Sequence, residues 1–390
     1  MPGLQSFERE ATRIRREQLR LSRALDAREA EFFAKEHVTG FGIGRKNNKP
    51  VVRFFVDRKV ALSKLSAKNR IPRRLVFGKQ TISTDVVAIG STPSLFTTTI
   101  GDPTQNDVNY HVDGVGTWDM GTMITVFIPG TLMAGAMPIG SGTSGCLVKQ
   151  RGGSGGPWMM SCEHVLFKDQ FDVAQHNQDR VPGVGQPLHN FVGGVREISR
   201  SIAYADAGLV ECEDASNVIL NIGAPKEQQT AAIYDGIYVQ KSGATTGVTW
   251  GQVTAALVRH KINNPMFAPS SPLSSFIGRN LFFITNSCTQ NPANPGVIAP
   301  GALNKFAAAG DSGSLIVLGK TDSPGTFNTP GEGLQKKYDS SKAADQASIV
   351  AKYDKAALGL LIAGNPKMAI GQEIDYALNQ AFTVQLDLVL

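Results

Sequence analysis

The stretch Gly310-Asp311-Ser312-Gly313-Ser314, followed by the apolar run Leu315-Ile316-Val317, decides the fold that we expect for this chain. Two glycines flank a serine, and glycine permits sharp turns where a side chain would clash. A turn of this kind presents the Ser312 hydroxyl and aims the amides of Gly310 and Ser312 at one point, where they can hold a developing oxyanion. A plain Gly-Ser hairpin turn has the same composition, so a base and an orienting acid elsewhere must decide between the two interpretations.

The favoured base among the six histidines is His164, which ends the apolar run Trp158–Leu166. A histidine at the end of a strand is held rigidly while it faces a cleft, although an ordinary core or rim histidine is the alternative. The favoured acid is Asp206, which stands between two alanines just before an apolar strand. A carboxylate in such surroundings is costly without a partner; a turn or cap aspartate is the alternative.

The three candidates occur in the order His164, Asp206, Ser312, separated by 42 and 106 residues. That order is the one used by chymotrypsin, and it differs from those of subtilisin and the α/β-hydrolases. These motifs resemble the chymotrypsin-like (trypsin-fold) serine peptidases, and more closely the narrow-leaf type of trypsin-like peptidases of plants and bacteria. The resemblance covers most of residues 38–390 and rests on the segments Gly40–Gly44, Asn69–Pro72, Thr84–Val87, Gly145–Val148, Glu163–Val165, Ala205–Ala207, Lys241–Gly243, Thr245–Gly247, Gly310–Ser314 and Gly359–Gly364.

The resemblance implies two antiparallel six-stranded β-barrels of chymotrypsin type with the site between them. It implies that Ser312 attacks a peptide carbonyl, that His164 takes and returns the proton, and that Asp206 orients the imidazole. The strand Gly359–Gly364 would then pair with the substrate backbone. Substrate contacts are accordingly expected from Leu361, Ile362, Ala363 and Gly364, and from Phe306 at the position of the pocket floor.

Three departures from the family pattern stand out. Val165 follows the histidine where classical members have cysteine, and no Ile-Val-Gly-Gly precedes the barrels, so activation by a freed N-terminus pairing with Asp311 is doubtful. Phe306 supplies no acid, so a preference for Arg or Lys before the scissile bond is not supported.

The composition agrees with a mainly β protein, since the chain has 41 Gly, 20 Pro and only 18% charged residues. Four scattered cysteines indicate neither a disulfide framework nor a zinc site, and we expect no metal and no cofactor. No apolar run approaches a membrane span, and Met1–Glu10 has no apolar core of a signal peptide. The expected location is therefore the cytoplasm, with no membrane partner.

We expect an N-terminal helix over residues 1–37, a small α/β domain over 38–90 and a connector over 91–136. The peptidase domain would cover 137–390, with its first barrel at about 137–232, its second at about 233–390 and a polar insertion at 320–357. The unit 38–90 has twelve basic residues against two acidic ones, a net charge of +10 in a chain whose total is +6. A solubilising surface, or one that docks on the rest of the chain, is favoured over nucleic-acid binding for this unit, because no stacking aromatics alternate with its basic residues.

The sequence thus predicts a serine endopeptidase acting on protein or peptide substrates. The N-terminal region or the insertion 320–357 would regulate it, with activation by a protein partner or by proteolysis. The rival hypothesis is a catalytically silent peptidase fold that binds protein or nucleic acid. The oligomeric state is left open.

Overall fold

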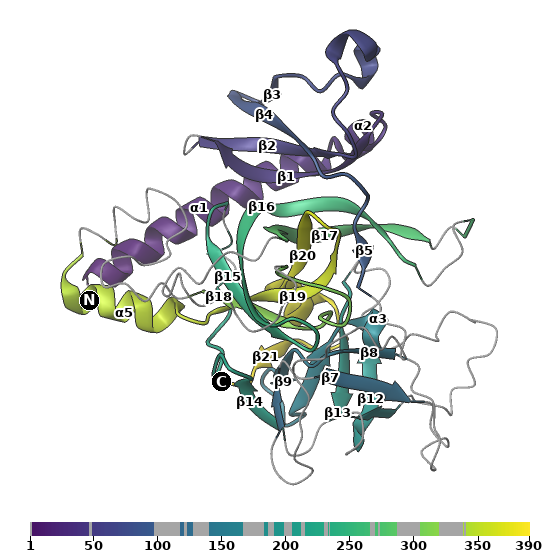
Figure 1. Cartoon of the computed structure of the whole chain (residues 1–390). Coiled ribbons are helices and arrows are strands. Elements are labelled where there is room, and N and C mark those ends of the chain that lie inside the picture. The colour runs from purple at the N-terminus through teal and green to yellow at the C-terminus, as the bar shows by residue number, and fades with distance from the viewer. Residues whose placement is uncertain are drawn as a thin grey trace.

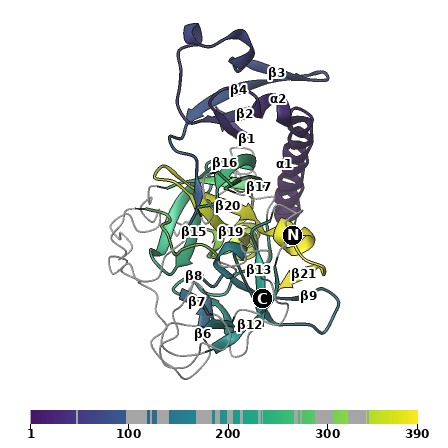
Figure 2. The same cartoon turned by 90° about the vertical axis from the view of Figure 1, so that its right-hand side faces the viewer.

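The protein is described here from a computed structural model (Figures 1 and 2). The structure describes residues 2–46, 49–96, 118–120, 123–127, 140–166, 183–185, 191–198, 205–211, 215–229, 233, 235–265, 270–271, 274–286, 305–319, 338 and 341–390. Most of the expected connector 91–136 and the first half of the insertion 320–357 lie outside these residues. The chain is mainly β, as predicted.

The N-terminal part places two helices against a small sheet (Figure 1). The apolar residues of Phe7–Lys35 lie mostly on one helical stripe and predict a single helix, but the structure has two helices, separated by a turn at residues 27–28. The sequence also predicts a short helix over Ala61–Asn69, where the structure has two 3-10 turns. The strands predicted for this unit, Val38–Arg45, Val51–Val56 and Thr81–Ile89, do not include β3, which the structure adds. The elements are α1 (Pro2–Asp26), α2 (Glu29–Phe33), β1 (Val38–Lys46), β2 (Lys49–Val56), η1 (Leu62–Lys64), η2 (Ala67–Asn69), β3 (Arg74–Phe77), β4 (Gln80–Ala88) and β5 (Ser94–Leu95).

Six strands of the C-terminal part close into a ring. They pair in the order β15, β18, β19, β20, β17 and β16, and β16 pairs back with β15. Leu360 in β19 lies opposite Leu315 in β18 on one side and Gln372 in β20 on the other. The strands are β15 (Tyr238–Gly243), β16 (Gly247–Asn263), β17 (Ser275–Thr285), β18 (Leu315–Leu318), β19 (Ala357–Gly364) and β20 (Met368–Glu373).

This ring continues into the N-terminal sheet. The 17-residue strand β16 also pairs with β1, with Gly40 opposite His260 and Ile43 opposite Ala256. Leu257 of β16 is buried in the same apolar cluster as Phe41 and Phe54 of the N-terminal sheet. Backbone pairing and apolar packing therefore join the basic unit to the ring, and our domain boundaries stay a prediction.

A second sheet lies below the ring in Figure 1 and pairs in the order β21, β9, β10, β13, β12, β11, β7, β8. Among the described residues this is an open row, so the closed six-stranded first barrel stays a prediction. Its strands are β7 (Met123–Phe127), β8 (Gly140–Thr143), β9 (Cys146–Gln150), β10 (Trp158–Ser161), β11 (Gly183–Gly185), β12 (Phe191–Ile198), β13 (Gly208–Glu211) and β21 (Leu386–Leu388). The strands β6 (Trp118–Met120) and β14 (Ala215–Ile219) pair with each other.

Three further helices lie close to these sheets. They are α3 (Glu163–Leu166), α5 (Ala343–Tyr353) and α6 (Ile374–Gln380). Within the polar insertion, the sequence predicts a helix over Ser340–Lys352, with Ser340 or Ser341 as its N-cap, and α5 confirms the helix. Helix α5 packs beside α1, where the rings of Phe7 and Tyr353 are 5.2 Å apart (Figure 1). Among the described residues, no helix combines the length and the apolar character needed to cross a membrane.

Candidate active site

Ser312 lies in a tight turn that leads directly into β18. Gly310 and Gly313 have φ angles of 94° and 96°, a backbone conformation that favours glycine. A Cβ atom on Gly313 would lie 2.2 Å from both the Ser161 hydroxyl and the Thr143 carbonyl oxygen, so glycine is also required here for space. The serine is thus fixed between two glycines, as the sequence predicts.

Ser312, His164 and Asp206 are brought together from three separate parts of the chain. The Nε2 atom of His164 lies 2.9 Å from the Ser312 hydroxyl, and its Nδ1 atom lies 2.5 Å from a carboxylate oxygen of Asp206. The other oxygen of Asp206 accepts a hydrogen bond of 3.0 Å from the backbone N–H of His164. One carboxylate therefore holds both the ring and the backbone of the histidine.

All three side chains are shielded from water. Ser312 has no exposed surface, while His164 and Asp206 are 5% and 7% exposed. The backbone N–H of Asp206 donates to the side chain of Gln372 in β20, 2.9 Å away. Gln372 is a residue that sequence reasoning missed, and it ties the acid in one sheet to a strand of the ring.

A metal ion is the other chemistry that this cluster offers. One ligand atom each from Cys162, His164 and Asp206 lies within 4.8 Å of the others. However, the His164 and Asp206 atoms bond to each other, and the Cys162 thiol donates to the Leu361 carbonyl oxygen at 3.2 Å. Burial raises the pKa of Cys162, and a metal requires the thiolate. The arrangement therefore fits proton transfer between side chains better than metal binding.

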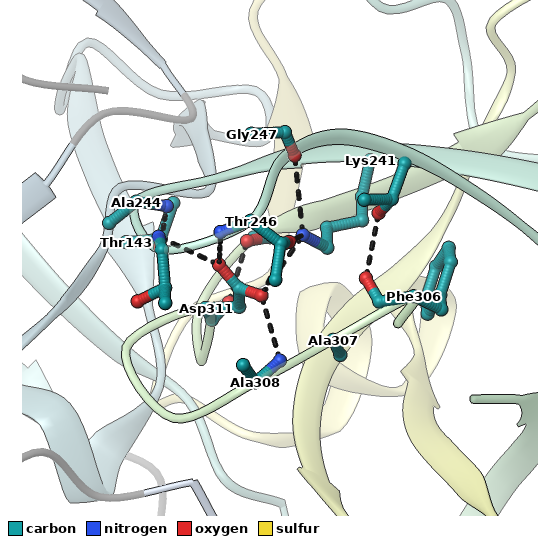
Figure 3. Close-up of polar contacts among 12 residues, drawn as sticks. Thr143, Lys241, Ala244, Thr246, Gly247, Phe306, Ala307, Ala308 and Asp311 are labelled. Atoms are coloured by element: carbon teal, nitrogen blue, oxygen red, sulfur yellow. Dashed lines mark hydrogen bonds and ion pairs between the residues drawn. The ribbon is translucent and has the colours of Figure 1, made fainter. Parts of the chain in front are cut away.

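The residue before Ser312, Asp311, forms a fully buried ion pair with Lys241 of β15 (Figure 3). The two charged atoms are 3.1 Å apart, and neither side chain has exposed surface. The Asp311 carboxylate also accepts hydrogen bonds from the backbone N–H groups of Thr245, Thr246 and Ala308. The buried Asp311 carboxylate therefore fixes the turn, because it accepts from Lys241 and from three backbone N–H groups.

Lys241 was not predicted as part of the site. The glycine turn Lys241–Gly247 between two strands predicts a plain hairpin from the sequence, and β15 and β16 do form that hairpin. The sequence shows a single charged residue, Lys241, in the strand Tyr238–Gly243. A lone lysine of this kind does not indicate where its counterion lies. Only the fold shows that the partner is Asp311, 70 positions further along the chain.

The predicted oxyanion site rests on the Gly310 and Ser312 amides. Neither N–H donates a hydrogen bond to any residue that the structure describes. The Gly310 carbonyl oxygen, in contrast, accepts a bond of 2.8 Å from the Thr143 hydroxyl. The two amides are therefore available to an oxyanion. The peptide that carries the Gly310 N–H is held in place, because the Ala309 carbonyl oxygen accepts a bond of 2.6 Å from the Thr245 hydroxyl.

The expected substrate contacts lie around the same turn. The Ser312 hydroxyl is 3.3 Å from the Ile362 carbonyl oxygen, and the Gly313 N–H donates to the Leu361 carbonyl oxygen at 2.9 Å. Phe306 is fully buried, and the Lys241 ammonium lies 5.9 Å from the centre of its ring. Strand β19 thus passes beside Ser312, and a buried cation, paired with Asp311, lies near Phe306.

In comparisons with known proteins, this chain is similar to solved structures in its overall fold. No family model and no curated protein matches the sequence. Among solved structures, a glutamic-acid-specific serine protease matches with 17% identity and a TM-score of 0.36, covering 67% of this chain and 96% of its own. A Nocardiopsis protease matches with 17% identity and a TM-score of 0.38 over 70% of this chain and 100% of its own.

A third similar structure is protease A of Thermobifida fusca, with 15% identity and a TM-score of 0.35 over 69% of this chain and 98% of its own. Nothing in these comparisons supports the narrow-leaf type specifically. At these identities and scores, the functional conclusion depends on the site's own geometry.

Proposed function

We propose that the protein is a serine endopeptidase that hydrolyses peptide bonds through Ser312, His164 and Asp206. The observation that carries this proposal is the continuous chain of contacts from carboxylate to imidazole to hydroxyl, at 2.5 and 2.9 Å. A serine hydroxyl is a weak nucleophile, and an adjacent base that is oriented by a third group is the arrangement that activates it.

In this mechanism His164 removes the hydroxyl proton as Ser312 attacks the substrate carbonyl carbon. The imidazolium is stabilised by Asp206 and then gives its proton to the leaving amine, which releases the first product and leaves an acyl-enzyme. Water repeats the sequence with His164 again as base. The Gly310 and Ser312 amides would donate to the oxyanion in both steps.

The rival is a silent peptidase fold that only binds protein or nucleic acid. Two observations favour the enzyme. A carboxylate that accepts both the ring and the backbone N–H of His164 fixes the imidazole for proton transfer, and this is unnecessary in a binding module. The Gly310 and Ser312 amides also donate to no residue that the structure describes. The cytoplasmic location and an activating protein partner remain expectations from the sequence.

The test is covalent labelling with a fluorophosphonate, followed by peptide hydrolysis, for the wild type and Ser312→Ala. Labelling should disappear, and turnover should fall on the order of 10⁴-fold or more, because the three residues act as a unit. His164→Ala should give a similar loss. Ser348→Ala is the matched control, since that serine is half-buried on α5 and lies 36 positions from Ser312 in the sequence.

If Ser312→Ala hydrolyses the peptide at the wild-type rate, or if the label attaches to another residue, the assignment is wrong. Folding of each variant is checked by its thermal midpoint, so that loss of structure is not mistaken for loss of the nucleophile.

A further inference from the structure

Two strands, β18 and β5, pair in turn along the edge of β19 that passes Ser312. Strand β20 covers one edge of β19 along residues 359–364. On the other edge β18 pairs along residues 357–360, and Gly313 and Ser314 of the preceding turn bond to Leu361. Beyond that point the second edge pairs with β5, with Leu95 opposite Ala363 and Ser94 opposite Gly364. The short strand β5 therefore occupies the edge at the residues expected to pair with substrate.

The register of β5 places Phe96 at the nucleophile. The pairing is antiparallel, so one further step sets Phe96 opposite Ile362. The Ile362 carbonyl oxygen is the one that lies 3.3 Å from the Ser312 hydroxyl. An extended peptide that adds to a sheet edge is held by its backbone, and its alternate side chains enter pockets. In this register Phe96 lies where a substrate would place the residue that precedes the cleaved bond.

The side chain of Phe96 is also packed as a substrate side chain in a pocket would be. It lies against the buried cluster that includes Phe306 and Leu361. The approach to the backbone is close, because a Cβ atom on Gly364 would lie 2.2 Å from the Phe96 ring. The same strand is anchored at its other side, where the Asn263 N–H donates to the Pro93 carbonyl oxygen at 2.8 Å and Ser94 lies opposite Asn263.

We propose that Ser94, Leu95 and Phe96 form a built-in pseudo-substrate that occupies the substrate edge of β19 and restrains the peptidase. The inference rests on the proposed function. Substrate and β5 compete for the same backbone groups of Ala363 and Gly364, so turnover requires that β5 first leave the edge. The complete burial of Ser312 agrees with an occupied site. A substrate that replaces β5 carries an apolar residue in the place of Phe96.

The first test compares the fluorophosphonate labelling rate of Ser312 in the wild type with that in Phe96→Ala. If the released state is a minor one, populated at about 1–10%, weakening the docked state should raise the rate about tenfold or more. Phe33→Ala is the matched control, because Phe33 is another half-buried phenylalanine but packs on the N-terminal cluster. Its labelling rate should equal that of the wild type.

The second test locks the segment in place and does not depend on the folding of Phe96→Ala. In the double variant Leu95→Cys with Ala363→Cys, the new cysteines are directly opposite each other on adjacent strands, within reach of a disulfide after slight relaxation. Mass spectrometry measures how much of the protein is cross-linked. The oxidised form should label more slowly than the reduced form of the same protein, and a reductant should restore the rate.

Equal labelling rates in the wild type and Phe96→Ala, or in the oxidised and reduced forms of the double variant, would overturn the pseudo-substrate and leave the endopeptidase intact. Absence of labelling in every form, including those with β5 released, would overturn both the proposed function and this inference.

Discussion

The ion pair of Lys241 with Asp311 connects the stability of the fold to the shape of the nucleophile turn. Both side chains are fully buried, and Asp311 is bonded to Ser312 through the backbone. A buried charge that loses its partner is strongly destabilising, because the remaining ion has neither water nor a counterion. Movement of the turn that carries Ser312 would let an unpaired Asp311 reach water or another donor, and would lower the energy of the buried charge.

Lys241→Met should therefore lower the free energy of unfolding by about 3–5 kcal/mol and also lower kcat, with a smaller effect on KM. Urea denaturation and peptide kinetics measure the two effects. Arg13→Met is the contrasting control: Arg13 pairs with Glu10 on the exposed face of α1, and such pairs contribute less than about 1 kcal/mol. Equal urea midpoints for the two variants would contradict this account of Lys241.

At the scale of elements, helix α1 contacts the strand that holds Asp206, the proposed catalytic acid. Arg15 of α1 forms a bidentate ion pair with Glu373 at the end of β20, and Glu373 is only 3% exposed. The neighbouring residue, Gln372, accepts the bond from Asp206. Burial raises the pKa of Glu373, and Arg15 opposes that shift. The helix thus stabilises a buried charge one residue from the support of the triad.

Arg15→Ala should destabilise the protein by about 3–5 kcal/mol at neutral pH, because Glu373 remains buried without its counterion. A carboxyl group whose pKa is raised by folding costs stability as the pH rises from its ordinary value through the folded value. The deficit of the variant against the wild type should therefore shrink as the pH is lowered from 7 toward about 4. Urea titrations of both proteins across this pH range measure the difference in the free energy of unfolding. A difference that grows on acidification would contradict this account of Arg15 and Glu373.

The elements around Phe306 predict what the proposed peptidase would accept before the scissile bond. Phe306 is buried, the Lys241 ammonium lies 5.9 Å from the centre of its ring, and Phe96 packs on the same cluster. A cationic substrate group there would be desolvated near another cation, whose counterion Asp311 is already paired. A peptide library should therefore show a preference for apolar residues before the cleaved bond. A strong preference for Arg or Lys would contradict this interpretation of the pocket.

At the scale of the whole molecule, the basic N-terminal unit is attached by more than charge. Strands β1 and β16 pair through their backbones, and an apolar cluster that includes Leu257 spans their junction. Purely electrostatic docking between exposed charges would weaken with salt, since screening acts within about 8–10 Å at physiological ionic strength. Removal of this unit would also expose an edge of β16, so a truncation of residues 1–90 tests stability as well as control.

We therefore expect the unit to stay attached when salt is raised from about 0.05 M to about 0.5 M. The radius of gyration from X-ray scattering and the pattern of limited proteolysis should be unchanged between the two conditions. An expanded particle, or new cleavage between the N-terminal sheet and the ring at high salt, would show that charge is the main attachment.

The sequence by itself determined the local chemistry of this protein. The Gly-Asp-Ser-Gly stretch, the histidine that ends an apolar run and the aspartate between alanines predicted three residues that the structure brings within hydrogen-bonding distance. It also indicated the mainly β character and the helix at 340–352. These features could be recognised because turn glycines, apolar runs and costly lone carboxylates act over a few neighbouring residues.

The tertiary structure alone decided which distant residues are partners. The pairing of Lys241 with Asp311, the support of Asp206 by Gln372 and the placement of β5 on the edge of β19 join segments between 70 and 270 residues apart. A lysine in a strand or a Ser-Leu pair after a proline has no local signature of its partner, because buried charges and strand edges are satisfied by whatever the fold brings next to them.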